Sequence, residues 1–83
     1  MEEITREQKL KLITDNVESV RHRFFRDLKE DYSPDTKSFF RQGVLGELQG
    51  IQSTVLFAFG SYCTAYEAAA AAWNEIHAIN LYS

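Results

Sequence analysis

Basic residues are absent from the second half of this sequence. All nine lysines and arginines lie within residues 1–41, whereas residues 42–83 carry three glutamates and no base. The net charge of −3 argues against binding to DNA or RNA, because that binding depends on basic side chains that displace counterions from phosphates. We therefore expect the charged first half to face solvent and the second half to be largely covered.

Cysteine is also scarce, and Cys63 is the only one, so no disulfide can form within the chain. A single cysteine among apolar neighbours fits a reducing compartment and an inert thiol, and we expect a cytoplasmic protein. The first residues are charged and lack the apolar segment of a secretory signal. The longest uncharged run, residues 48–66, is interrupted by glutamine, serine and threonine, so we expect no membrane span.

Motifs for catalysis, cofactor binding and metal binding are missing. Glu18 and His22 are four residues apart and Glu75 and His77 are two apart, but a zinc site needs three or four converging ligands. The Glu-x-x-His pairs of di-iron bundles, nucleophile elbows and phosphate-binding glycine loops do not occur. We expect no enzyme activity, no cofactor and no metal, with His22 solvated and His77 at a helix end.

The first predicted helix covers residues 5–31. Thr5 and Gln8 form a capping-box pattern at its start. An apolar residue recurs every three or four positions and forms one stripe along the helix: Leu10, Ile13, Val17, Val20, Phe24 and Leu28. Opposite charges four residues apart mark the faces that are exposed to water: Lys11 with Asp15, Arg23 with Asp27, and Arg26 with Glu30.

A second helix is predicted over residues 34–59. Ser33 suits the N-cap, Pro34 the first helical position and Asp35 the positive end of the helix dipole. The short connection predicts that this helix packs antiparallel to the first. The sequence therefore predicts an all-α fold in a single domain over residues 1–83, either an antiparallel helical hairpin or a three-helix bundle.

The choice between hairpin and bundle depends on Gly60. The sequence Phe59-Gly60-Ser61 indicates a helix stop and a third helix over residues 61–80. An unbroken apolar heptad is instead typical of one long, bent helix. A strand over residues 55–59 is a further alternative that has no evident partner strand. The heptad positions are Val44, Leu48, Ile51, Val55, Ala58, Tyr62, Ala65, Ala69, Ala72, Ile76 and Ile79.

The second half holds more apolar and small side chains than one partner helix can cover. Gly43, Gly46, Gly50 and the alanines at 68–72 would let another helix approach closely. We therefore predict a homo-oligomer, with a dimer favoured. Its seam is predicted at Val44, Leu48, Ile51, Val55, Ala58, Ala65, Ala69, Ala72 and Ile76.

We expect a small helical module that binds and occludes another protein, as an inhibitor, an adaptor or an antitoxin-like protein does. Tyrosine and tryptophan are enriched at interface hot spots, and acidic side chains would suit a basic partner. The predicted partner-binding residues are Tyr62, Tyr66, Trp73, His77, Asp27, Glu30, Asp31 and Asp35. The aromatic residues among them could instead fill the core or a dimer seam. A small regulator encoded by a phage or mobile element would match this description, although no residue indicates that origin.

Two other functions stay open. A DNA-binding regulator could use a basic region between Arg21 and Arg41, with residues 36–42 in a recognition helix. That region comprises Arg21, Arg23, Arg26, Lys29, Lys37 and Arg41, and nearby acidic side chains would neutralise it. A purely structural subunit would instead use the seam alone to build a larger homo-oligomer. Tyr82 is expected to be peripheral.

Overall fold

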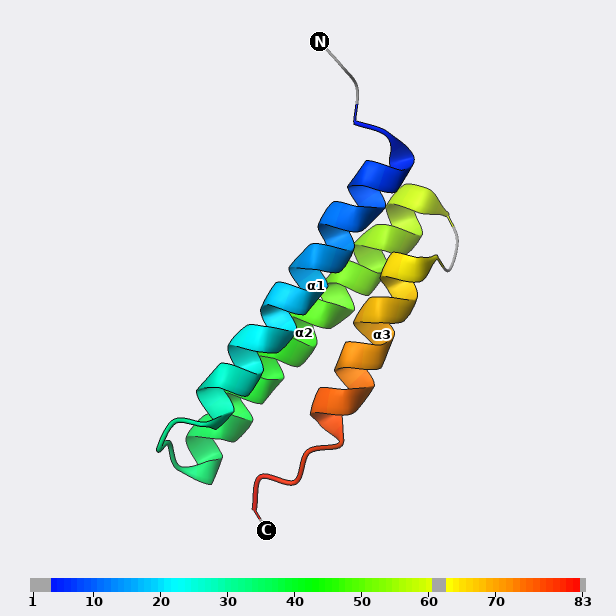
Figure 1. Ribbon diagram of the computed structural model, residues 1–83. Helices are drawn as coiled ribbons and strands as arrows, with labels where there is room; N and C mark the ends of the chain where they lie inside the picture. Colours follow the sequence, from blue (N-terminus) through cyan, green and yellow to red (C-terminus); the bar gives the residue numbers. More distant parts are fainter. Residues whose placement is uncertain (1–3, 61–62, 83) are drawn as a thin grey trace.

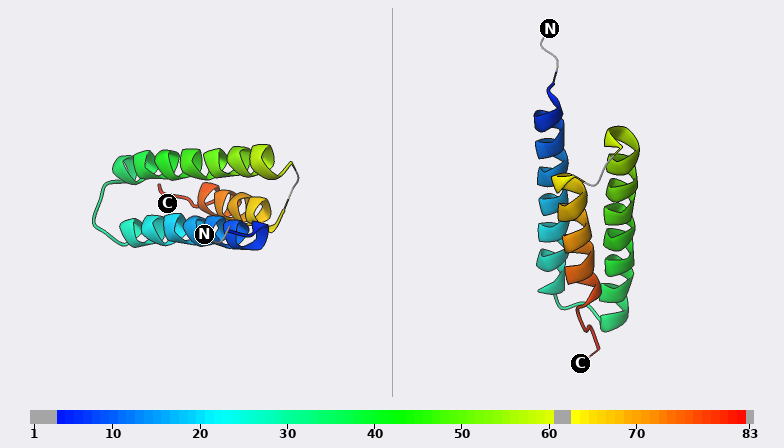
Figure 2. Two further views of the ribbon diagram at one scale, coloured as in Figure 1. Left: turned by 90° about the horizontal axis from the view of Figure 1, so that it is seen from above. Right: turned by 90° about the vertical axis from the view of Figure 1, so that its right-hand side faces the viewer.

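A computed structural model, which describes residues 4–60 and 63–82, shows an all-α bundle of three helices. The helices are α1 (Arg6–Leu28), α2 (Pro34–Phe59) and α3 (Thr64–His77). α2 runs antiparallel to α1, and α3 returns antiparallel to α2 and lies along the groove between the other two (Figures 1 and 2). The predicted three-helix bundle is confirmed. Within the described residues, every helix is too short or too polar to cross a bilayer.

The start of α1 follows the capping-box prediction. The backbone N–H of Thr5 donates to Oε1 of Gln8 over 2.8 Å, and the Thr5 hydroxyl accepts from the backbone N–H of Gln8 over 3.1 Å. The helix ends at Leu28, earlier than residue 31, because the backbone N–H of Lys29 bonds to carbonyls two and three residues back. These hydrogen bonds are shorter in range than the α-helical bond to the carbonyl four residues back, and they are common in the last turn of a helix.

The start of α2 also agrees with the sequence pattern. The Ser33 hydroxyl accepts a hydrogen bond of 3.2 Å from the backbone N–H of Thr36, and Pro34 and Asp35 occupy the first turn. These groups satisfy one of the free N–H donors of the helix start and place a carboxylate near its positive end. The short connection from α1 then reverses the chain, as predicted.

Gly60 separates α2 from α3. It has a φ of +66° in the left-handed region, and its backbone N–H bonds to the carbonyl of Leu56 over 2.8 Å. Glycine adopts this conformation without a steric penalty. The single bent helix is therefore wrong, and so is the strand, because residues 55–59 belong to α2. Cys63 is the N-cap of α3, whereas residue 61, the predicted start of the third helix, lies outside the described residues.

The core is built from all three helices. The reversal at Gly60 turns the apolar stripes of α2 and α3 toward each other and toward α1. Both parts of the predicted heptad pattern therefore face the core, but they lie on two separate helices. Buried alanines on α3 leave room for a close approach of the neighbouring helices. The core cluster comprises Val17, Val20, Phe24, Val44, Leu48, Ala69, Ala72 and Ile76.

The predicted oligomer seam lies mostly inside this chain. Most of its residues are buried by the other two helices, so a second copy cannot reach them. The prediction assumed that one helix had to cover the whole second half, whereas α2 and α3 cover each other. The buried seam residues are Val44, Leu48, Val55, Ala65, Ala69, Ala72 and Ile76, whereas Ile51 is half-buried and Ala58 is exposed.

Candidate functional site

The turn from α1 to α2 concentrates negative charge. Residues 27–35 contain four acidic side chains and one lysine. Asp27 is half-buried and pairs with Arg26 over 3.7 Å. Glu30 and Asp31 are exposed and form no side-chain hydrogen bond or ion pair with any residue that the structure describes. This charge is therefore largely left to solvent.

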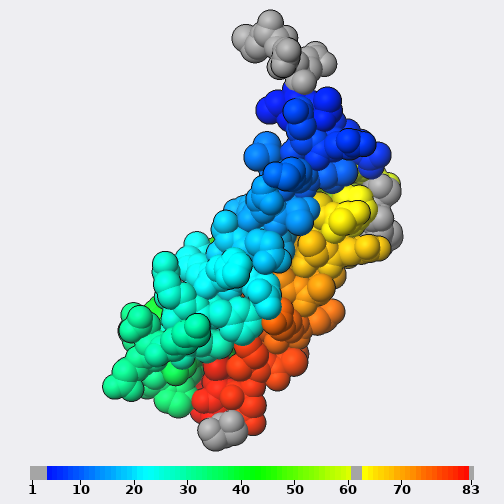
Figure 3. Space-filling view, viewed as in Figure 1, coloured from blue at the N-terminus to red at the C-terminus, as the bar shows by residue number. Residues whose placement is uncertain are grey.

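The segment after α3 packs against the same end of the bundle (Figure 3). The Tyr82 hydroxyl donates a hydrogen bond of 3.1 Å to Oδ1 of Asp35, and Nη1 of Arg41 donates one of 2.5 Å to the carbonyl of Ile79. These two contacts tie the C-terminal segment to the start of α2. Tyr82 was expected to be peripheral, and it is 62% exposed, but it reaches an acidic residue of the predicted site.

A second exposed tyrosine lies in the turn itself. Tyr32 is 44% exposed, and its ring meets the ring of Phe40 edge-on with centroids 5.3 Å apart. Tyr32 is therefore oriented by α2 while part of it remains open to water. Glu30, Asp31, Tyr32, Asp35 and Tyr82 together are called the acidic end below.

The predicted aromatic residues of α3 divide into two places. Trp73 is half-buried against the core, and its ring stacks on that of His77 with centroids 4.6 Å apart and planes 12° from parallel. The Trp73 Nε1 is buried without a hydrogen-bond partner among the described residues. Tyr66 lies near the start of α3 and is half-buried, whereas Tyr62 lies outside the described residues. Only Trp73 and His77 lie on the half of α3 that leads to the acidic end.

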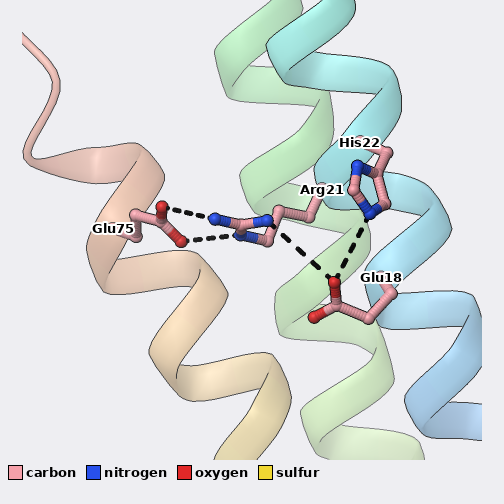
Figure 4. A network of polar contacts seen from close by, with 4 residues as sticks. All are labelled: Glu18, Arg21, His22 and Glu75. Atoms are coloured by element: carbon pink, nitrogen blue, oxygen red, sulfur yellow. Dashed lines mark hydrogen bonds and ion pairs between the residues drawn. The ribbon is translucent and has the colours of Figure 1, made fainter.

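A polar network joins α1 to α3 (Figure 4). The Nε and Nη2 of Arg21 each donate a hydrogen bond of 2.8 Å to the Glu75 carboxylate. Glu18 lies 4.0 Å from Nη1 of Arg21 and 3.7 Å from Nε2 of His22. The Arg21 guanidinium also lies over the ring of Phe25, 5.0 Å from its centroid. This bidentate geometry holds the two helices in register.

Arg21 and Glu75 stabilise each other's charged forms. The hydrogen bond from Arg21 is the main reason that the pKa of Glu75 is lowered from its ordinary value, with the positive charge of Arg21 adding to it against partial desolvation. The hydrogen bond to Glu75 likewise raises the pKa of Arg21. Both groups are therefore charged at neutral pH. The pair is a structural tie, because neither member faces an enclosed cavity.

Other arginines of the predicted basic region also have partners within the chain. Nη2 of Arg23 donates to both oxygens of Glu47 over 2.8 Å. The predicted pairs of Arg23 with Asp27 and of Arg26 with Glu30 are therefore wrong, since Arg23 reaches across to α2 and Arg26 contacts its neighbour. The pair of Lys11 with Asp15 is confirmed at 3.6 Å. Arginines engaged in this way have less charge to offer a nucleic acid.

Metal binding has no support in the part of the chain that is described. No group of three histidine, cysteine or acidic side chains among those residues is close enough to hold an ion. Glu18 lies 3.7 Å from Nε2 of His22 without a third ligand beside them, and His77 stacks on Trp73 away from both.

The glycines of α2 were noted from the sequence as a place where another helix could approach, but the exposed phenylalanines on the same side were not. Phe39 is 72% exposed and Phe57 is 92% exposed. An open groove of about 400 Å³ lies between α1 and α2, and no residue of α3 lines it. Its lining residues are Ile13, Asn16, Glu47, Gly50, Ile51, Thr54 and Val55. A heptad count started from Phe39 would have found this side, because Phe39, Gly43, Gly46, Gly50, Ser53 and Phe57 form a second stripe.

No protein-family model, no curated protein and no solved structure matches this chain.

Proposed function

We propose that this protein acts by binding another protein through the acidic end and covering part of that partner's surface. The observation that carries the proposal is the grouping of two exposed tyrosines with three exposed carboxylates, with Tyr82 hydrogen-bonded to Asp35 at 3.1 Å. Tyrosine supplies a large apolar ring with a polar tip, a combination enriched in interface hot spots. The carboxylates supply the charge that selects a partner.

The fold does not account for the two acidic residues at the centre of this surface. Glu30 and Asp31 directly follow the C-terminal end of α1, where the helix dipole is negative and disfavours a further negative charge. Neither side chain has an ion-pair partner among the described residues to offset that repulsion. An interface with positively charged groups would supply the missing partners.

The chemistry of the partner follows from the same residues. Residues 27–35 have a charge balance of −3, so the matching surface carries lysine or arginine around an apolar patch that accepts the tyrosine rings. Charges at such a rim mainly raise the association rate and exclude wrong partners. A partner that uses its own basic surface to bind another molecule would be blocked by this contact. The acidic end thus suits an inhibitor or an adaptor without any catalytic step.

Site-specific cross-linking in the cells that make the protein tests this proposal. A photoreactive phenylalanine analogue is placed at Tyr32 in one variant and at Leu12, which is exposed on α1, in a matched control. We expect irradiation to join a discrete partner protein to the Tyr32 variant and not to the Leu12 variant. The absence of an adduct at Tyr32, or the same adducts from both positions, would contradict the proposal.

A further inference from the structure

The side of α2 that faces away from the core carries an unusual stripe of residues. It consists of exposed residues at spacings of four, three, four, three and four, which form one line along a helix. The stripe is named the back face and comprises Phe39, Gly43, Gly46, Gly50, Ser53 and Phe57. Phe39 and Phe57 are each nine residues, or about two and a half turns, from the fully buried Leu48. Their positions therefore lie on the opposite side of α2 from Leu48, an outer side that Figure 2 shows without a neighbouring helix.

Packing within the chain explains neither the glycines nor the phenylalanines of the back face. A Cβ added at Gly43, Gly46 or Gly50 would meet no atom within 4 Å, so alanine would fit each position. Each glycine nevertheless weakens an exposed helix relative to alanine. Phe57 is 92% exposed and packs little surface against its own chain. Both anomalies disappear if another helix lies close against this side.

The back face also lacks free charge. α1 carries ten charged residues, whereas α2 carries only Glu47 after Arg41. The Glu47 carboxylate accepts hydrogen bonds of 2.8 Å at both oxygens from Arg23, so its charge is matched within the chain. A solvent-facing helix surface is ordinarily the most charged part of a bundle. This one could be covered without burying an uncompensated ion.

We propose that the back face is occupied by the back face of a second copy of this chain, with the two α2 helices antiparallel. The stripe is symmetric about Leu48: Gly46 and Gly50 lie two residues from it, Gly43 and Ser53 five, and Phe39 and Phe57 nine. A two-fold axis at Leu48 therefore places Phe39 against the partner's Phe57 at each end. Small residues face small residues in between. A two-fold interface requires this kind of self-complementary surface.

The size of the contact is consistent with a reversible dimer. The stripe extends over about 27 Å of helix, at 1.5 Å per residue. Four phenylalanines, two from each copy, bury roughly 150 Å² or more each, and the closely approaching glycine backbones add to that area. The four rings alone account for about 600 Å², half of the roughly 1,200 Å² at which stable complexes begin, so the contact belongs with weak, transient interfaces. Association is therefore expected to depend on concentration in the micromolar range.

The back face shares no residue with the acidic end or with the buried heptad positions. The dimer and the binding of a partner protein can therefore be tested independently of each other. Sedimentation equilibrium over a concentration series measures the association. We expect the wild-type mass to rise from that of one chain to that of two. Phe57→Glu and Gly46→Leu are expected to weaken the dimer at least tenfold, whereas Leu12→Glu, at an exposed position of α1, leaves it unchanged. Circular dichroism confirms that each variant keeps its helices.

The outcome that overturns the dimer is a wild-type protein that stays a monomer throughout the series, or a Phe57→Glu variant that associates as strongly as the wild type. Cross-linking tests the antiparallel arrangement in a Cys63→Ser background. A mixture of Gly43→Cys and Ser53→Cys chains is expected to form a disulfide between the two kinds of chain. Gly43→Cys alone is not, because two copies of that position lie about 15 Å apart along the helix. Efficient cross-linking of Gly43→Cys to itself would overturn the antiparallel arrangement.

Discussion

Arg21 on α1 donates two hydrogen bonds of 2.8 Å to Glu75 on α3, across 54 residues of sequence. The contact joins the first helix to the last, and both side chains are only partly buried. Planar bidentate pairing fixes the orientation of both groups more strongly than a single ion pair does. The pair therefore favours the position of α3 in the groove between α1 and α2.

Replacing Glu75 is expected to make stability less dependent on pH. The folded-state pKa of Glu75 is lowered from 4.5, so the charged carboxylate stabilises the fold at pH values above the unfolded pKa. That stabilisation is lost as the pH falls through the folded pKa. We expect Glu75→Gln to lower the Tm modestly at pH 7, with a difference from the wild type that shrinks below pH 4.5 and in high salt. Thermal unfolding followed by circular dichroism measures both effects.

Glu67→Gln is the matched control for this experiment. Glu67 lies on the same helix and is exposed, and it has no ion-pair partner among the described residues. Its replacement should leave the dependence of Tm on pH close to that of the wild type. A Glu75→Gln variant whose Tm followed the wild-type Tm at every pH would show that the pair contributes nothing to stability.

Glycine-to-alanine substitutions in and after α2 are expected to act in opposite directions. Gly60 has a φ of +66°, where an alanine Cβ costs roughly 1–2 kcal/mol, so Gly60→Ala should destabilise the protein. Gly43 is helical and a Cβ there meets nothing, so Gly43→Ala should stabilise the isolated chain by about 0.8–1 kcal/mol. Urea denaturation at low protein concentration measures both variants. Equal destabilisation by the two would contradict the left-handed helix end at Gly60.

Replacing a leucine with alanine should strongly destabilise the protein at Leu48 in α2 and hardly affect its stability at Leu12 in α1. Leu48 is fully buried in the core cluster, and Leu48→Ala should cost about 2–5 kcal/mol. In a chain of this size that lowers the Tm by roughly 4–8 °C for each kcal/mol. Leu12 is 60% exposed, so Leu12→Ala should change stability by less than about 0.5 kcal/mol. Calorimetry compares the two, and similar Tm losses would be inconsistent with the core described above.

Local patterns predicted the helices well because each depends on residues close in sequence. The Thr5–Gln8 capping box, the Ser33-Pro34 start and the stop at Gly60 are all short-range signals, and all three are found in the structure. The end of α1 was predicted too late, since the sequence continues with charged residues that are compatible with another helical turn. The presence of each helix could thus be predicted from the sequence, but the residue at which α1 ends could not.

Contacts between helices were harder to predict. The heptad phase continues by chance across Gly60, so residues that line the core were assigned to a seam between copies. The partners of Arg21 and Arg23 lie on other helices, and no spacing in the sequence identifies them. Tyr82 also reaches Asp35 only through the return of α3. Of the four acids predicted to bind a partner, Glu30, Asp31 and Asp35 are exposed and Asp27 is half-buried, and their role stays a prediction. The two tyrosines beside them could be recognised only from the fold.

Charge reversal at the acidic end is expected to abolish binding to the partner protein. The variant is Glu30→Lys with Asp31→Lys, and both positions are exposed in the turn between helices. The control is Asp15→Lys with Glu67→Lys, which changes the net charge equally at exposed positions away from that end. Both variants should keep the helical content of the wild type, since neither changes a core residue.

The most direct measurement is quantitative affinity capture from cells that make the protein, followed by titration of the captured partner against all three purified proteins. We expect the wild type and the Asp15/Glu67 control to bind the same partner with similar affinity. The Glu30/Asp31 variant should bind it at least about tenfold more weakly, a loss of about 1.4 kcal/mol or more. Equal affinity for all three proteins, or the absence of any partner that saturates in the titration, would contradict partner binding through the acidic end.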